Sequence, residues 1–78
     1  MRKFFIICHR GLLPENWRFY CAHCQQDHVH GAREGLRSSH CRTPTSPFYK
    51  ETYFIVLLTS DWYDRWKAGE LQGRPWLP

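Results

Sequence analysis

Cysteine and histidine side chains that could bind a metal ion are concentrated in one short part of the chain. CAHCQQDHVHG, residues 21–31, places two cysteines two residues apart and two histidines shortly after them, and SSHC, residues 38–41, adds a histidine–cysteine pair. Zinc is held by four tetrahedral thiolate or imidazole ligands, and a Cys-x2-Cys pair supplies half of such a set. The spacing therefore predicts a zinc site, with a redox-active or inert cysteine pair as the alternative.

The predicted zinc ligands combine the two segments, and they are Cys21, Cys24, His30 and Cys41. Cys41 is preferred to His40 because thiolate binds zinc strongly at neutral pH and adjacent side chains tend to point apart. The choice between His28 and His30 is nearly even, so His28 and His40 stay open as alternatives. An all-cysteine site with Cys8 is less favoured, because Cys8 ends an apolar run and is expected to be a core residue.

This ligand set favours a structural Zn2+ ion over a catalytic one. A catalytic zinc keeps one position open for water and needs a general base nearby. The chain has neither an HExxH motif nor the deaminase combination of a histidine, a glutamate two residues later and a separate CxxC. QDHV, residues 26–29, is faintly similar to the Asp-His-hydrophobic strand of HNH nucleases, but the only asparagine, Asn16, lies upstream of it. We therefore expect no enzyme activity, with a nuclease as the less favoured reading.

Short strands are expected to position these ligands. KFFIIC, residues 3–8, is typical of a strand buried on both faces, and WRFYC, residues 17–21, favours a second strand. DHVHG, residues 27–31, predicts a third strand whose alternation places both of its histidines on one face, with the CxxC pair in the preceding turn. Glycines, serines and prolines predict a loop over residues 31–47, which metal binding would anchor.

The C-terminal half predicts one strand and one helix. ETYFIVLLTS, residues 51–60, is the strongest strand signal in the chain. The following segment predicts a helix that Ser60 or Asp61 can cap and that Gly73 ends. Trp62 and Trp66 lie four residues apart, so we expect them to share a face that packs on the sheet.

Together these elements predict one α+β domain over residues 1–78. We expect a three- to four-stranded, mainly antiparallel sheet with a zinc knuckle at one end and one C-terminal helix packed across it. For GRPWLP, residues 73–78, two alternatives stay open: the segment folds back through Trp76, or it forms a flexible tail that engages a partner.

The longer pattern YCAHCQQDHVHG followed by LRSSHCRTPTSPFYKETYFIVL resembles small uncharacterised zinc-ribbon-like proteins of actinobacteria and their phages. The likeness lies in the CxxC, the HxHG, the HC pair and a Ser-Pro-aromatic stretch before a closing strand, within residues 19–56. It implies zinc binding and a bacterial or phage cytoplasm. It implies no activity, because none is assigned to that group.

Chain length and the N-terminal residues set the expected compartment. With 78 residues the core is small, and such domains usually need a metal, disulfides or an oligomeric interface. The apolar run from Phe4 to Cys8 is shorter than the roughly 7 to 15 residues of a secretory signal, and no stretch approaches the roughly 20 that span a bilayer. We therefore expect a cytoplasmic protein without membrane association, whose cysteines are reduced or metal-bound.

Positive charge is concentrated in the half that carries the candidate metal ligands. Residues 1–42 have seven Lys and Arg against three Asp and Glu, whereas residues 43–78 have four against four. Such a basic excess favours an anionic partner. We therefore expect a zinc-stabilised module that binds nucleic acid through phosphate contacts, made by Arg18, Arg33, Arg37 and Arg42.

The alternative function is a zinc-stabilised protein-interaction module, such as a phage inhibitor of a host protein. The chain has four Trp, four Tyr and five Phe, more than so small a core requires, and Trp and Tyr are frequent interface anchors. Trp76 is the expected anchor. No small-molecule substrate is expected, and free strand edges make a homodimer a further expectation.

Overall fold

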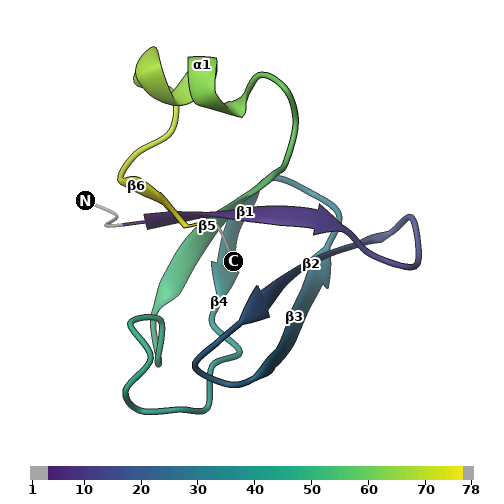
Figure 1. Cartoon of the computed structure of the whole chain (residues 1–78), viewed down its shortest axis with the longest axis vertical. Helices are drawn as coiled ribbons and strands as arrows, with labels where there is room; N and C mark the ends of the chain where they lie inside the picture. Colours follow the sequence, from purple (N-terminus) through teal and green to yellow (C-terminus); the bar gives the residue numbers. More distant parts are fainter. Residues whose placement is uncertain (1–3, 77–78) are drawn as a thin grey trace.

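The computed structural model describes residues 4–76 as one curled sheet with one short helix (Figure 1). The strands are β1 Phe4–Arg10, β2 Asn16–Cys21, β3 Gln26–Gly31, β4 Gly35–Ser38, β5 Thr52–Leu57 and β6 Arg74–Trp76. Their order is β3-β2-β1-β5-β4, and β6 pairs with β1. The α+β class agrees with the sequence, but the predicted count of three to four strands was too low.

β1 is the central strand and has parallel neighbours. It pairs in parallel with β5, from Phe5 opposite Phe54 to Cys8 opposite Leu57, and in parallel with β6. The pairs β1–β2, β2–β3 and β4–β5 are antiparallel. Parallel strands need a long connection, and the segment with the helix supplies it between β5 and β6. The mainly antiparallel prediction therefore misses the centre of the sheet, where the paired segments are far apart in sequence.

β4 lies inside the segment that was predicted to be a loop, so that prediction was wrong for these four residues. β4 pairs antiparallel with β5, from Gly35 opposite Ile55 to Ser38 opposite Thr52. Its residues are half-buried or exposed and form no apolar run. Pairing with β5, whose own residues are strongly strand-forming, is what makes this segment extended.

Alternation along β1 separates two cores. Ile6 and Cys8 belong to one, and Phe5 and Ile7 to the other, which agrees with the prediction of a strand buried on both faces. The first core, here called the Cys/His face, contains Ile6, Cys8, Phe19, Cys21, Cys41, Phe48, Tyr53 and Ile55. The second, here called the helix face, contains Phe5, Ile7, Val56 and Leu71.

The helix α1, Trp62–Lys67, covers the helix face (Figure 1). The ring centroids of Trp62 and Trp66 lie 6.3 and 6.4 Å from that of Phe5, so the predicted packing of both tryptophans on the sheet is confirmed. The helix is shorter than predicted because it ends at Ala68, and Gly69 then adopts a φ of +83°, a left-handed conformation that suits glycine.

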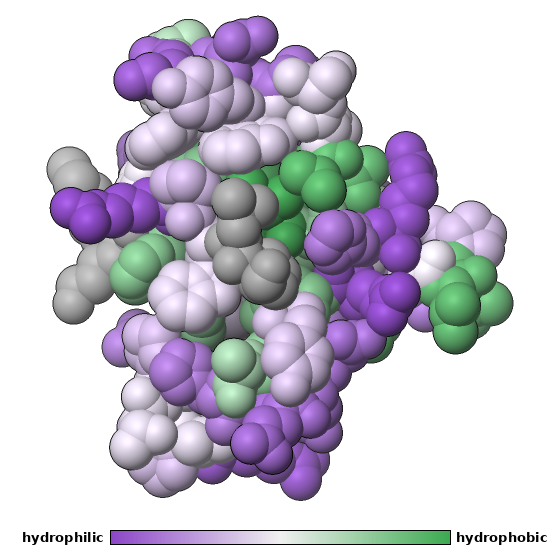
Figure 2. Space-filling view, in the orientation of Figure 1, coloured by the Kyte–Doolittle hydropathy of each residue, from purple (hydrophilic) through white to green (hydrophobic). Residues whose placement is uncertain are grey.

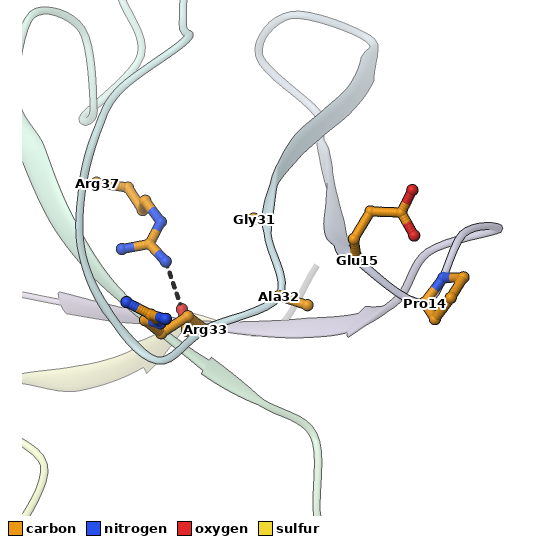
Figure 3. A pocket seen from close by; sticks show the side chains of 6 residues that line it. All are labelled: Pro14, Glu15, Gly31, Ala32, Arg33 and Arg37. Carbon is orange, nitrogen blue, oxygen red and sulfur yellow. Dashed lines mark hydrogen bonds between the residues drawn. The ribbon is translucent and has the colours of Figure 1, made fainter.

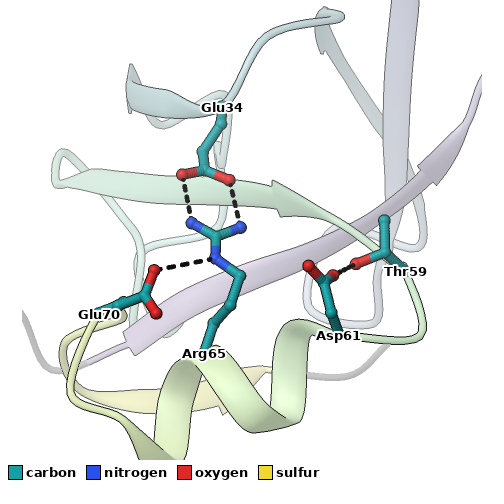
Figure 4. Close-up of polar contacts among 5 residues, drawn as sticks. All are labelled: Glu34, Thr59, Asp61, Arg65 and Glu70. Atoms are coloured by element: carbon teal, nitrogen blue, oxygen red, sulfur yellow. Dashed lines mark hydrogen bonds and ion pairs between the residues drawn. The ribbon is translucent and has the colours of Figure 1, made fainter.

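Polar contacts at the ends of α1 connect it to the rest of the chain (Figure 4). Asp61 occupies the N-cap position as predicted, but its carboxylate accepts a hydrogen bond from the Thr59 hydroxyl and caps no backbone N–H. Arg65 donates two hydrogen bonds to Glu34, at 2.9 and 2.8 Å, and its Nε lies 3.7 Å from Glu70. The helix is thereby tied to the residue just before β4.

The C-terminal segment folds back onto the domain through β6. The Trp76 ring centroid lies 4.8 Å from that of Phe48 and 5.4 Å from that of Phe4. Of the two alternatives for GRPWLP, the one in which the segment folds back therefore applies up to Trp76. Residues 77–78 lie outside the described residues, and so do residues 1–3, which include the predicted start of the first strand. Within residues 4–76, no helix is long and apolar enough to cross a membrane.

Candidate metal centre

The β2–β3 hairpin presents alternate side chains to the Cys/His face. Phe19, Cys21, His28 and His30 are buried, whereas the residues between them are exposed. Phe19 is the partner of His28 in the register. Both histidines therefore lie on one face, as their alternation predicted. Cys24 lies in the turn between the strands, where Gln25 has a φ of +55°.

Four side chains converge at the turn end of this hairpin. Cys21, Cys24, His28 and Cys41 each offer one ligand atom, and these atoms all lie within 4.8 Å of one another. The Cys21 and Cys41 Sγ atoms are 3.7 Å apart, and the His28 Nε2 lies 3.4 Å from the Cys41 Sγ. All four cysteines of the chain are free of disulfides.

These distances fit a tetrahedral metal ion. Metal–sulfur bonds of about 2.3 Å and metal–nitrogen bonds of about 2.0–2.1 Å place two sulfurs about 3.8 Å apart, and a sulfur and a nitrogen about 3.5 Å apart. The observed 3.7 and 3.4 Å agree with both values. Three thiols and one imidazole are a donor set that zinc prefers. The cluster could therefore hold a metal ion.

Hydrogen bonds hold the Cys41 segment against the CxxC turn. The Ser39 hydroxyl accepts a hydrogen bond from the Cys41 N–H at 3.0 Å. The Thr43 hydroxyl reaches the His23 carbonyl at 3.1 Å and the Cys24 sulfur at 3.6 Å. Sequence reasoning missed Thr43, because a hydroxyl that contacts a ligand from 19 residues away leaves no local pattern.

The three clustered cysteines are not equivalent, as two of their pKa values show. The Thr43 hydroxyl, helped by the backbone N–H groups of Arg42 and Thr43, lowers the pKa of Cys24 to about 6. Burial raises the pKa of Cys21 to about 11, against the opposing effect of nearby backbone N–H groups. Cys24 is therefore the more readily ionised of the two thiols, and a bound cation would favour the thiolate form of both.

His30 lies beside the cluster and has a different partner. Its Nε2 is 2.6 Å from the Tyr53 hydroxyl, and its ring stacks on Phe19 with centroids 6.4 Å apart. Burial, with further effects from His40 and Arg37, lowers the pKa of His30 to about 4.

His28 thus stands with the cysteines in the place that was predicted for His30. Two residues along a strand are separated by roughly 6.6 Å. The alternation pattern places both histidines on the same face, so it cannot tell which of them reaches the cysteines. The exposed His40 packs 4.5 Å from the His30 ring and is not among the four converging side chains. Cys8 is fully buried in the Cys/His face, and burial raises the pKa of its thiol to about 12.

The four arginines expected to contact phosphate differ in their surroundings. Arg18 forms an ion pair with Asp27 at 2.8 Å, so its charge is balanced. Arg33, Arg37 and Arg42 form no ion pair with any carboxylate of residues 4–76. Three unpaired arginines therefore lie on the segment that leads into and just past Cys41, and Arg10 and Arg74 likewise form no ion pair within residues 4–76.

No protein-family model matches the chain, and no curated protein or solved structure matches it either. The resemblance to zinc-ribbon-like proteins of actinobacteria and their phages therefore stays a prediction.

Proposed function

We propose that the chain is a small zinc-stabilised module that binds nucleic acid, in a bacterial or phage-infected cytoplasm. The zinc part is supported by the cluster of three cysteines and His28, whose spacing matches tetrahedral coordination. Four protein ligands would fill the metal's coordination shell and leave no position for a reacting water. A metal held in this way would be structural, which supports the expectation of a module without enzyme activity at this site.

The nucleic-acid part is carried by one observation, the unpaired arginines on the segment next to the cluster. Arg33 and Arg37 precede Cys41 and Arg42 follows it, so a metal bound to Cys41 would hold this basic segment against the sheet. Elsewhere, Arg18 and Arg65 have carboxylate partners. Unpaired arginines on an ordered surface attract phosphates, because each contact releases a condensed counterion.

The protein-interaction alternative has weaker support. Its expected anchor, Trp76, is half-buried against Phe4 and Phe48 and contributes to the fold. The exposed edge strands β3 and β4 leave a homodimer as an expectation. We therefore rank a protein partner below nucleic acid.

Fluorescence anisotropy of a labelled 12-nucleotide strand, measured over a series of salt concentrations, tests the proposed function. Zinc-loaded protein should bind with an affinity that falls with salt, and chelation should abolish binding. Arg42→Ala should lower the slope of log K against log salt by about 0.7. Lys67→Ala on α1 is the control, because it removes one exposed charge far from the cluster, and it should leave the slope unchanged. Absence of binding at low salt would contradict the proposal.

A further inference from the structure

A hollow of 490 Å3 lies between the β1–β2 turn and the segment that precedes β4 (Figure 3). It is lined by Pro14, Glu15, Gly31, Ala32, Arg33 and Arg37. In Figure 3 the two arginines lie on one side and the turn residues on the other, with Gly31 and Ala32 between them. The hollow therefore has a basic wall opposite a wall made by the turn.

The basic wall is pre-arranged. The Arg37 guanidinium donates hydrogen bonds to the Leu36 carbonyl at 2.8 Å and to the Arg33 carbonyl at 2.6 Å. An arginine has five N–H donors, so three of them stay available to a ligand. With Glu15 also lining the hollow, the site carries a net single positive charge. That charge matches one phosphodiester group.

The opposite wall belongs to the β1–β2 turn, in which Leu12 and Leu13 are exposed to solvent. The turn is closed by hydrogen bonds from the Gly11 N–H to the Asn16 carbonyl at 2.8 Å and from the Asn16 N–H to the Leu13 carbonyl at 3.0 Å. A Cβ at Gly11 would lie 2.9 Å from that Asn16 oxygen, so the tight closure requires glycine. Leu12 is nevertheless 95% exposed and Leu13 is 53% exposed.

The apolar turn and the basic wall are parts of one surface. The Ala32 N–H donates to the Glu15 carbonyl at 2.9 Å, which ties the turn to the residue next to Arg33. Figure 2 shows hydrophobic side chains projecting at the far right, over the β1–β2 turn, with hydrophilic side chains between them and the body of the molecule. Minor-groove-binding proteins insert leucine and proline side chains between the base steps of duplex DNA, so an exposed leucine can make apolar contact with a base.

We propose that the turn and the hollow form one nucleotide subsite. Arg33 and Arg37 hold a phosphodiester in the hollow, and Leu12 and Leu13 lie against the adjoining base. This inference rests on the proposed function, since it states where a nucleic-acid strand is held. The subsite adds a contact with a base to the arginine–phosphate contacts of the proposed function.

The test compares a thymidine 12-mer with an abasic strand of the same length, which keeps the phosphates and lacks the bases. The double variant Leu12→Ser/Leu13→Ser should weaken binding of the thymidine strand about fivefold, through lost burial of apolar surface, and leave abasic binding unchanged. Leu58→Ser is the matched control, because Leu58 is 44% exposed, follows β5 and does not line the hollow. It should change neither affinity. Arg33→Ala, which keeps the backbone contacts of Arg37, should weaken both strands.

Three results would overturn the subsite. In the first, the wild type binds both strands, but the leucine variant either binds them as Leu58→Ser does or loses the same affinity for both. The proposed function would then stand without this subsite. The leucine variant could instead lose binding to phosphatidylglycerol vesicles while strand binding is unchanged, which would assign the turn to a membrane surface. If the folded, zinc-loaded wild type binds neither strand, the proposed function fails and the subsite with it.

Discussion

The two faces of the central strand are built by different physical means. On the helix face, Phe5 and Ile7 pack with aromatic side chains of α1, and burial of apolar surface is sufficient to close the core. On the Cys/His face, the same strand packs beside buried thiols and imidazoles; an imidazole is costly to bury unless it is hydrogen-bonded, and a thiol is costly to bury once it is ionised. One face therefore closes with apolar side chains alone, whereas the other carries a Cys/His cluster that could hold a metal ion.

Metal removal should have the largest effect on stability among the changes that test the difference between the two faces. Structural zinc contributes an apparent binding free energy of about 10–16 kcal/mol in finger peptides, as much as the entire stability of a typical domain. Because β1 and β5 belong to both faces, we expect chelation to unfold the whole chain, as followed by circular dichroism. Hydrogen exchange should show that β2–β3 loses protection first. An unchanged spectrum after verified zinc loss would contradict a structural site.

A matched pair of core variants separates the faces. Phe5→Ala on the helix face and Phe19→Ala on the Cys/His face each remove a buried phenyl ring, at a cost of about 3–5 kcal/mol in the free energy of unfolding. Only Phe19 contacts His28, with ring centroids 5.4 Å apart. We therefore expect zinc affinity, measured by competition with a chromophoric chelator, to fall for Phe19→Ala alone. Equal losses of affinity would show that the faces are not separable.

The two histidines of β3 give a finer comparison within the Cys/His face. His28→Ala removes a candidate ligand and should lower zinc affinity more than about 100-fold, beyond the usual effect of losing a supporting residue. His30→Ala removes the imidazole partner of the buried Tyr53 hydroxyl, which should cost about 1–3 kcal/mol of stability. Its zinc affinity should fall less than about tenfold. The reverse order would restore His30 as the ligand.

The ion pair that ties α1 to the sheet should have the smallest effect. Glu34→Gln should cost no more than about 1 kcal/mol, because Glu34 and Arg65 are partly exposed, and zinc affinity should not change. Hydrogen bonds from Arg65 lower the pKa of Glu34 below its usual 4.5. This contribution is therefore present at neutral pH and is lost as the pH falls through that lowered pKa. Glu70→Gln, whose contact with Arg65 is longer, is the control in acid unfolding curves.

Patterns confined to one segment were the predictable part of this molecule. The burial of β1 on both faces, the common face of His28 and His30, and the packing of Trp62 and Trp66 all follow from periodicity within a few residues. The CxxC turn was likewise expected between two strands. Each of these needs information only from neighbours in the chain.

The misses in the sheet have a common cause in pairing between distant segments, whereas the miss in the helix has a local one. β4 is extended because β5 lies beside it, and the parallel centre of the sheet joins β1 to strands near the other end of the chain. The helix ends early, at Ala68, because Gly69 takes a left-handed conformation there. No local pattern predicts a role for the apolar turn at Leu12 and Leu13, although the exposure of both side chains distinguishes it.

The sequence by itself determined which residue types are available for a metal site and which residues share a strand face, because these depend on composition and on a period of two. Only the tertiary structure decided that His28 and not His30 joins the cysteines, and that Arg33 and Arg37 face the β1–β2 turn. The physical reason is that both outcomes depend on distances of a few ångströms between segments far apart in the chain. Strand pairing sets those distances, and local propensity does not.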